Sequence, residues 1–250
     1  MGKSWLLERM EPILKEYDRQ GRSPTACTFS DISVREGRVG PRTRDRLCII
    51  GGAAMKDPIP YWDANYEIWC CNAMWRKGFD QEGRFRADRW FELHPPEVQT
   101  TQELEWIRTC PIPLYVWPGW NSILAPTHVV YPLRWVCEEI FTWGNRPQAY
   151  FTNTFALQVA LAIKEGFKLI YLADIWLEQG RELCVERACL EFWLGVARGR
   201  GIEVYLSRNC PILQHPFMYG RDYVEEKAEV EARLRMILPS IAHDGYAGSR

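Results

Sequence analysis

From Leu47 onward, short apolar runs alternate with longer stretches in which apolar residues recur at helical spacing. This alternation is typical of repeated βαβ units, because parallel strands need long crossover connections that are usually helices. The predicted strands are Leu47–Ile50, Tyr66–Cys71, Arg89–Leu93, Leu114–Trp117, Lys168–Ala173 and Glu203–Leu206. The predicted helices are Gln102–Thr109, Pro132–Phe141, Thr154–Glu165 and Glu186–Arg200. We therefore expect an α/β fold of the doubly wound, Rossmann-like class, with a mainly parallel sheet of about six strands.

Composition divides the chain into three parts. Residues 1–46 begin with an amphipathic helical pattern that ends near Tyr17, and then become rich in Gly and Arg. Residues 47–220 carry the βαβ pattern and form the expected Rossmann-like nucleotide-binding domain. Residues 221–250 contain a charged amphipathic pattern over Tyr223–Leu238 and a short tail. The arginines between Arg35 and Arg46 are interpreted as a solvated linker.

The charge balance limits which partners are expected, and the cysteines indicate the compartment in which the protein acts. Lys and Arg number 31 against 32 Asp and Glu, and the net charge of -1 gives no general basic field for nucleic acid. A local patch at Arg35–Arg46 leaves nucleic-acid binding open. The 9 cysteines form no Cys-x-x-Cys pair and lie in apolar segments, as reduced thiols do. No signal peptide or membrane span is recognisable, so a cytoplasmic protein without a membrane partner is expected.

Two small or polar segments follow the first two predicted strands, where ligands of open parallel sheets bind. Gly51, Gly52 and Ala53 come after the first strand, and such small residues let backbone N–H groups approach a phosphate or a ribose. The alternative is a simple turn. Asn72 ends the second strand, and its amide suits a nucleobase edge or a ribose as well as a turn cap.

Three further segments are candidates at the ends of later elements. His94 follows the third strand and could act as a general base or a phosphate ligand, since both its protonation states are accessible near neutral pH. Thr152, Asn153 and Thr154 open a helix, where such side chains cap free N–H groups or bind phosphate. Asp174 begins an acidic stretch that could supply an acid or base, or form a solvated loop. The other acidic residues of that stretch are Glu178, Glu182 and Glu186.

Several familiar motifs are missing from the sequence. There is no Walker-type phosphate loop, no Gly-x-Gly-x-x-Gly turn, no Gly-x-Ser-x-Gly elbow and no His-Glu-x-x-His helix. The 4 histidines are not paired at ligand spacing, so no metal site and no bound cofactor are predicted.

The order of these segments resembles a known group of proteins. Its motifs are Gly51-Gly-Ala-Ala54, Tyr66-Glu-Ile-Trp-Cys-Cys-Asn72, Trp90-Phe-Glu-Leu-His-Pro95, Tyr150-Phe-Thr-Asn-Thr154 and Gly166-Phe-Lys-Leu-Ile-Tyr-Leu172. Over about Leu47 to Leu213 the chain is similar to uncharacterised bacteriophage proteins. More distantly it resembles the bacterial CMP-sialic-acid-dependent sialyltransferases and the archaeal pterin diphosphokinases of the MptE-like group.

The sialyltransferase resemblance implies a metal-independent transfer of a glycosyl group from a CMP-sugar, in the cytoplasm of a host cell if a phage encodes the protein. It implies that the CMP part of the donor lies against Gly51–Ala53, Asn72 and Thr152–Thr154. His94 or Asp174 would then serve as the catalytic base.

Two other functions remain open. The pterin-kinase resemblance implies diphosphoryl transfer, which would need a nucleoside triphosphate and Mg²⁺. A catalytically silent phage protein that binds a nucleotide, or docks on a host or phage protein through exposed tryptophans, is the third possibility. Ala54-Met55 stands where the sialyltransferases have Pro-Ser, and this difference favours the silent protein.

Overall fold

The computed structural model describes residues 42, 44–53, 57–80, 82–117, 127–140, 142–143, 146–147, 149–177, 183–207 and 210–214. The predicted terminal helices, most of the Arg-rich linker and Ala54-Met55 lie outside the described residues. The described residues fall into two units: Leu133–Ala149 belongs to one, and the remainder to the other. The unit without Leu133–Ala149 holds the main sheet and every residue of the predicted site.

The main sheet has seven strands, all parallel, in the order β5-β4-β3-β2-β1-β8-β9. Its strands are β1 (Arg46–Ile50), β2 (Tyr66–Cys71), β3 (Arg89–Glu92), β4 (Leu114–Val116), β5 (His128–Val130), β8 (Leu169–Ala173) and β9 (Glu203–Leu206). All six predicted strands are present, within one residue at either end. The prediction of an α/β, Rossmann-like fold with a parallel sheet is confirmed.

The strand order reverses at one place in the sheet. From β1 the chain adds β2, β3, β4 and β5 in one direction, and it then returns to place β8 and β9 on the other side of β1. The topological switch point therefore lies between β1 and β8. In open parallel sheets, ligands bind beyond the carboxyl ends of the strands at this point.

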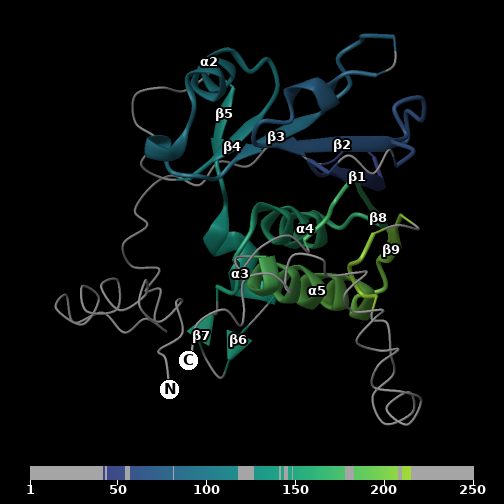
Figure 1. The fold of residues 1–250 in the computed structure, drawn as a ribbon. Coiled ribbons are helices and arrows are strands. Elements are labelled where there is room, and N and C mark those ends of the chain that lie inside the picture. The colour runs from purple at the N-terminus through teal and green to yellow at the C-terminus, as the bar shows by residue number, and fades with distance from the viewer. Residues whose placement is uncertain are drawn as a thin grey trace, which may run out of the picture. The chain divides into compact units, whose positions relative to one another are not determined.

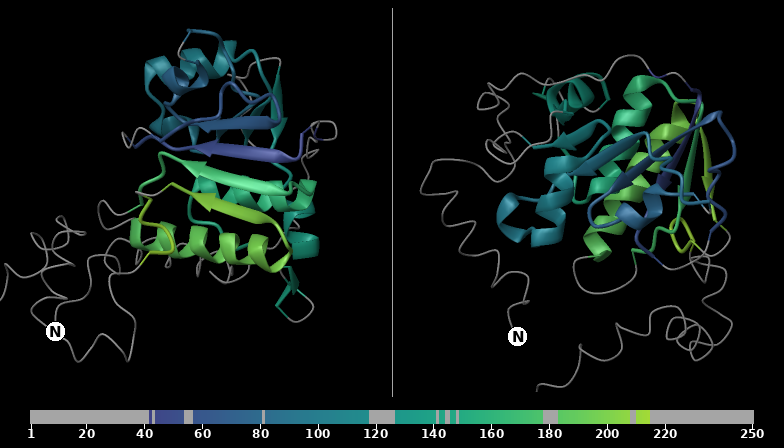
Figure 2. Two further views of the ribbon diagram at one scale, coloured as in Figure 1. Left: turned by 90° about the vertical axis from the view of Figure 1, so that its right-hand side faces the viewer. Right: turned by 90° about the horizontal axis from the view of Figure 1, so that it is seen from above.

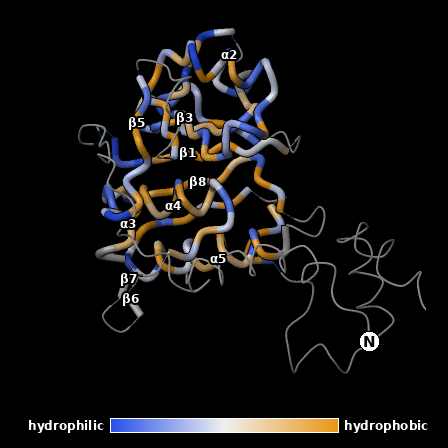
Figure 3. The backbone as a smooth tube through the Cα atoms, turned by 90° about the vertical axis from the view of Figure 1, so that its left-hand side faces the viewer, coloured by the Kyte–Doolittle hydropathy of each residue, from blue (hydrophilic) through white to orange (hydrophobic). Residues whose placement is uncertain are grey.

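Helices lie over both faces of the sheet (Figures 1 and 2). Helix α2 (Thr101–Thr109) covers one face, and α4 (Thr154–Glu165) and α5 (Leu183–Gly199) lie over the other. Beneath α2, the inward side chains of β1 to β4 form an apolar cluster with Ile107. Figure 3 shows hydrophobic residues running through β1, β8 and α4. Two short 3-10 helices, η2 (Trp75–Gly78) and η3 (Pro96–Val98), follow β2 and β3.

Helix α4 has the predicted boundaries, and local chemistry explains both of its ends. The side chain of Asn153 accepts a hydrogen bond from the Ala156 N–H and so caps the helix. Gly166 ends it in the left-handed conformation at φ 79°, which glycine adopts without a steric cost. Between these ends the helix is buried almost all round, as its composition predicts.

The structure also departs from the expected boundaries. Strand β5 is not predicted, because it is an edge strand of 3 residues and gives too short a pattern to recognise. Helix α5 begins three residues before the predicted start. In the other unit, α3 (Leu133–Ile140) matches the predicted helix Pro132–Phe141 within one residue at either end, and β6 (Thr142–Trp143) pairs antiparallel with β7 (Arg146–Pro147).

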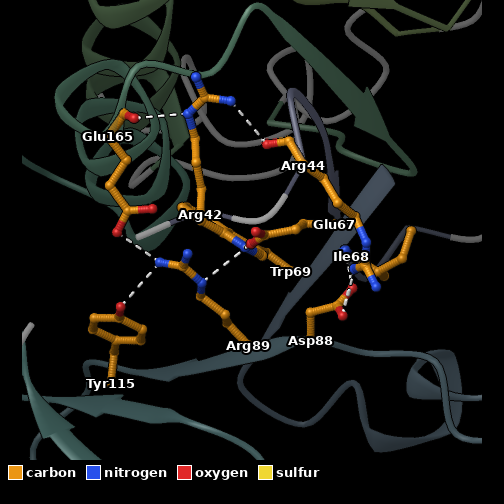
Figure 4. A network of polar contacts seen from close by, with 9 residues as sticks. All are labelled: Arg42, Arg44, Glu67, Ile68, Trp69, Asp88, Arg89, Tyr115 and Glu165. Carbon is orange, nitrogen blue, oxygen red and sulfur yellow. Dashed lines mark hydrogen bonds and ion pairs between the residues drawn. The ribbon is translucent and has the colours of Figure 1, made fainter. Parts of the chain in front are cut away.

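A buried charge network ties α4 to the amino edge of the sheet (Figure 4). Arg89, at the start of β3, lies 3.2 Å from the Glu67 carboxylate and 2.6 Å from the Glu165 carboxylate at the end of α4. Arg89 also donates to the Tyr115 hydroxyl at 3.1 Å, and the indole N–H of Trp69 donates to Glu67 at 3.0 Å. Hereafter we call Glu67, Arg89 and Glu165 the amino-edge triad.

Two linker arginines dock on the sheet unit instead of lying in solvent. The Arg42 Nε donates to the backbone oxygen of Glu165 at 2.9 Å, and Arg44 pairs with Asp88 at 2.6 Å. The Asp88 carboxylate in turn accepts from the Ile68 N–H at 2.8 Å. For these two residues the expectation of a solvated linker is wrong, because a carboxylate and a helix carbonyl lie within their reach.

The cysteines that the structure describes are buried and lie outside disulfide bonds: Cys48, Cys70, Cys71, Cys110, Cys137, Cys189 and Cys210. Burial raises the pKa of Cys110 to about 11, so the group remains a thiol at neutral pH. None of the helices in the described ranges is both long and apolar enough to span a bilayer.

Candidate functional site

Four predicted site residues follow four neighbouring strands, at the carboxyl edge of the sheet. Gly51 follows β1, Asn72 follows β2, His94 comes shortly after β3, and Asp174 follows β8. Since these strands are adjacent and parallel in the order β3-β2-β1-β8, their carboxyl ends meet at one edge. The topology therefore brings together segments that are far apart in the sequence.

At the switch point, the loops after β1 and β8 are in direct contact. The Gly51 N–H donates to the Ala173 oxygen at 2.8 Å, and the Ala53 N–H donates to the Asp174 oxygen at 3.0 Å. A Cβ at Gly51 would lie 2.2 Å from the Asp174 backbone oxygen, so only glycine fits there. These two N–H groups hold the loops together and are not available to a phosphate. Gly52 is exposed, and within the described part of the chain its N–H has no partner.

Lys77 and Asp57 also take part in this contact between the loops after β1 and β8, which we call the junction. The sequence analysis did not identify either residue. The Lys77 ammonium donates to the backbone oxygens of Gly51 at 2.9 Å and Ala53 at 2.7 Å, and it pairs with the Asp174 carboxylate. Asp174 also accepts from the Asp57 N–H at 2.9 Å, and its own N–H donates to the Asp57 carboxylate at 2.8 Å. A lone lysine after a strand gives no periodic signal, so only the tertiary contacts identify its role.

Asp174 therefore contacts both of the other charged residues of the junction, Lys77 and Asp57. Its side chain is buried, both of its carboxylate oxygens have partners, and its backbone has a positive φ of 53°. Aspartate tolerates this left-handed conformation better than most residues. These contacts suit a residue that positions the loops around it.

Beside this junction is a hollow of about 680 Å³, lined by α2 and by the loops after β1 and β2. It begins at Gly52 and Lys77, and its apolar wall includes Phe79 and Trp106. One face of α2 contributes exposed polar side chains at helical spacing, among them Gln102 and Glu105. The volume falls within the range of small-molecule sites, about 300 to 1,000 Å³. We call this feature the α2 hollow.

The indole nitrogen of Trp106, on the wall of the α2 hollow, is buried without a hydrogen-bond partner. A buried donor without a partner costs free energy, about 1–3 kcal/mol. The ring packs against Trp90 with centroids 4.7 Å apart, which fixes its position. Trp106 therefore presents to the hollow an aromatic ring whose position is fixed by packing.

Asn72 combines turn geometry with a vacant acceptor. Its φ of 50° is positive, its N–H donates to the Phe91 oxygen at 3.0 Å, and its own oxygen accepts from the Trp90 indole at 3.2 Å. Its side-chain oxygen is buried and has no partner. Asn72 does not line the α2 hollow, although the next residue, Ala73, does. The turn explains why an asparagine suits this position.

His94 has a fixed carboxylate partner. Its Nδ1 lies 3.2 Å from the carboxylate of Glu92, which is 1% exposed and also accepts from the Gln99 amide at 3.1 Å. The hydrogen bond to this carboxylate raises the pKa of His94, and burial opposes that shift. Glu92 is the last residue of β3 and His94 follows two positions later, so the Glu-x-His spacing at the strand end is the signal that could have indicated this pair.

Thr152, Asn153 and Thr154 lie at the start of α4, on the other face of the sheet from α2. The Thr152 hydroxyl donates to the Val185 oxygen at 3.2 Å, and the Asn153 amide donates to the Glu186 oxygen at 2.8 Å. These two hydrogen bonds tie the start of α4 to α5. Of the residues expected to share one pocket, which are Gly51, Gly52, Asn72 and Thr152–Thr154, Gly52 alone lines the α2 hollow.

Most tryptophans with described side chains are shielded from solvent. Trp69, Trp90 and Trp193 are fully buried, whereas Trp62 is 75% exposed. The side chains of Trp5, Trp75 and Trp120 lie outside the described residues, as do Glu178 and Glu182. Among the described residues, no group of three His, Cys, Asp or Glu side chains is arranged to hold a metal ion.

The sheet order and its switch point define an α/β, Rossmann-like protein, and the junction and the α2 hollow define its candidate site. Compared with protein-family models, curated proteins and solved structures, the chain has no match.

Proposed function

We propose that this protein binds a nucleotide sugar at the carboxyl edge of its sheet and transfers the glycosyl group, acting in the cytoplasm as a glycosyltransferase-like protein. The observation that carries the proposal is the α2 hollow of about 680 Å³ beside the topological switch point. The α/β fold supports a ligand at this edge but does not by itself specify a reaction.

The lining of the hollow suits the nucleoside part of such a ligand. Trp106 and Phe79 offer aromatic surface to a base, and stacking of this kind contributes about 1–3 kcal/mol per base. Gln102 can donate and accept, and the Glu105 carboxylate can accept from an amino group or a ribose hydroxyl. A flat base with a polar edge matches this combination of side chains.

The charges near the hollow favour a ligand with few phosphates. Among the described residues that line the hollow, Lys77 is the cation, and Asp174 already pairs with its ammonium group. Glu105 adds a negative charge to the same surface. A triphosphate would meet little uncompensated positive charge here, whereas the single phosphate of a CMP-sugar needs less. The local charge therefore favours a CMP-sugar over the nucleoside triphosphate that diphosphoryl transfer requires.

Isothermal titration with CMP, CMP-sialic acid and ATP tests the proposal. We expect CMP and the CMP-sugar to bind, and Glu105→Ala and Trp106→Ala to weaken binding about 5- to 150-fold, the equivalent of about 1–3 kcal/mol. Glu105 is exposed, so its replacement should not disturb the fold. Trp62→Ala removes an exposed tryptophan that does not line the hollow, and it should bind CMP like the wild type.

Two results would argue against this function. Unchanged CMP affinity in both hollow variants would mean that the nucleoside lies elsewhere. Binding of ATP with Mg²⁺ but not of CMP would favour the diphosphoryl-transfer alternative. For the docking alternative, Trp62 is the one tryptophan that is largely exposed among the described side chains, at 75%, and a single exposed ring is less than the contiguous apolar patch that a docking surface needs.

A further inference from the structure

Two polar side chains on the wall of the α2 hollow have no partner among the described residues. Gln102 and Glu105 both line the hollow and are exposed, and no other described residue pairs with the Gln102 amide or the Glu105 carboxylate. The two residues are three positions apart on α2, so their side chains are neighbours on one side of the helix. They can therefore reach adjacent atoms of one ligand.

Trp106 provides the surface on which the base of such a ligand would stack. It directly follows Glu105, it lies one helical turn after Gln102, and it lines the same hollow. Its contact with Trp90, at 4.7 Å between ring centroids, holds the indole in place. A base stacked on this ring turns its hydrogen-bonding edge toward side chains beside the ring. Gln102 and Glu105 stand in that position on the helix.

The two side chains differ in the groups that they can bind. A carboxylate only accepts hydrogen bonds, so Glu105 favours a base with an amino group and disfavours a carbonyl oxygen at the same place. The Gln102 amide can donate to a ring nitrogen next to that amino group. Cytosine and adenine both carry an amino group beside a ring nitrogen that accepts, whereas uracil carries a carbonyl oxygen beside an N–H group.

No described lining residue offsets the charge of Glu105. Lys77 is the cation among these residues, and its ammonium group already pairs with Asp174 and donates to two backbone oxygens. A carbonyl oxygen of uracil would therefore face a carboxylate without a compensating donor. An amino group would instead satisfy the carboxylate when the base displaces the water around it.

We propose that the α2 hollow selects its nucleotide by the amino group of the base, and that Glu105 is the residue that determines this specificity. Cytidine and adenosine nucleotides are then ligands, and uridine nucleotides are excluded. The inference rests on the proposed function, but it extends the ligands beyond cytidine. The hollow of about 680 Å³ has room for the larger ring of adenine.

Isothermal titration with CMP, AMP and UMP tests this selection. We expect the wild type to bind CMP and AMP about 5- to 150-fold more tightly than UMP, the discrimination that a well-placed contact to a base provides. Glu105→Gln keeps the shape of the side chain and adds a donor for a carbonyl oxygen. It should weaken the binding of CMP and AMP and strengthen that of UMP, so that the three affinities converge. General damage to the hollow would instead weaken all three ligands alike.

Glu97→Gln is the matched control, because it makes the same exchange at an exposed glutamate of η3 that does not line the hollow. This variant should keep the wild-type ratio of CMP to UMP affinity.

The outcomes separate this inference from the proposed function. If the wild type does not bind CMP, the proposed function fails, and the specificity assigned to Glu105 fails with it. If CMP binds, three results would overturn the specificity alone: equal affinity for UMP, no binding of AMP, or an unchanged ratio of CMP to UMP affinity in Glu105→Gln.

Discussion

The two edges of the same parallel sheet contain very different polar groups. At the amino edge, the side chains of Arg89 and Glu67 are 4% and 5% exposed, and together with Glu165 they join β2, β3 and α4. At the carboxyl edge, the side chains of Lys77 and His94 are 26% and 51% exposed. The three charged side chains at the first edge are enclosed by packing, whereas at the second edge two buried carboxylates, Asp174 and Glu92, each hold a partly exposed partner, Lys77 or His94.

This difference separates stability from binding. A buried ion pair that loses one partner leaves an uncompensated charge in the interior, which is far more costly than the same change in a solvated pair. At the carboxyl edge, the buried side-chain oxygen of Asn72 has no partner, which costs free energy in the folded protein unless a bound group donates to it. Replacements at the amino edge should therefore affect unfolding, and those at the carboxyl edge should affect ligand affinity.

The largest effect is expected for Arg89→Met, because it removes the only cation of the amino-edge triad and leaves two buried carboxylates. Breaking such a group should lower the free energy of unfolding by about 3–5 kcal/mol. Urea denaturation followed by circular dichroism measures the loss. Arg84→Met is the control: the Arg84 side chain is 67% exposed, and its partner Asp80 keeps hydrogen bonds from the Glu82 and Arg84 N–H groups, so unfolding should be almost unchanged. Equal losses in the two variants would contradict the distinction between buried and solvated charges.

The next effect concerns the junction, where two adjacent glycines should respond differently. Gly51→Ala places a Cβ 2.2 Å from the Asp174 oxygen, so the loops after β1 and β8 must separate, at a cost of about 1–3 kcal/mol. At Gly52 the nearest atom to such a Cβ would be the Met74 methyl at 3.8 Å, and Gly52→Ala should fold normally. Thermal melting of the two variants provides the comparison. Equal melting temperatures would mean that the junction does not need its close contact.

Asn72 tests whether a residue at the carboxyl edge acts on the ligand or on the turn. Asn72→Gly and Asn72→Ala both remove the amide, but only alanine is strained at the positive φ of 50°. If the amide contacts the nucleotide, both variants should bind CMP about 5- to 150-fold more weakly, while only the alanine variant melts earlier. Wild-type affinity in the glycine variant would assign Asn72 to the turn alone. Titration calorimetry and melting curves measure the two quantities separately.

The smallest effect is the pH dependence of stability from His94. Its folded pKa is raised above 6.5, so its stabilising contribution is complete below that value and is lost as pH rises through the folded pKa. Because the side chain is half exposed, solvent screening limits the contribution to about 0.5 kcal/mol. The difference in melting temperature between wild type and His94→Asn should shrink from about pH 6 to about pH 8. A difference that is constant over this range would mean that the His94 pKa is not raised by folding.

The strands show how far the sequence alone leads. Tyr66–Cys71 and Glu203–Leu206 have the predicted limits, and so does Thr154–Glu165, because long apolar runs and caps leave a clear local signal. Strand β5 has no such signal, since 3 residues at a sheet edge carry little pattern. The same pattern identified the residues at the strand ends as site candidates, but it could not identify the residues that contact them in the folded protein.

Local periodicity and turn chemistry thus determined the α/β class, the strands and the helix α4, because each depends on neighbours a few residues away. Only the tertiary structure determined that Lys77 holds the Gly51 loop and Asp174, and that Glu92 supports His94. It also assigned Gly51 to a close contact between loops and placed Thr152 against α5. Lys77 and Asp174 are 97 positions apart, and no local pattern can encode a contact that exists only after the sheet has brought β1, β2 and β8 side by side.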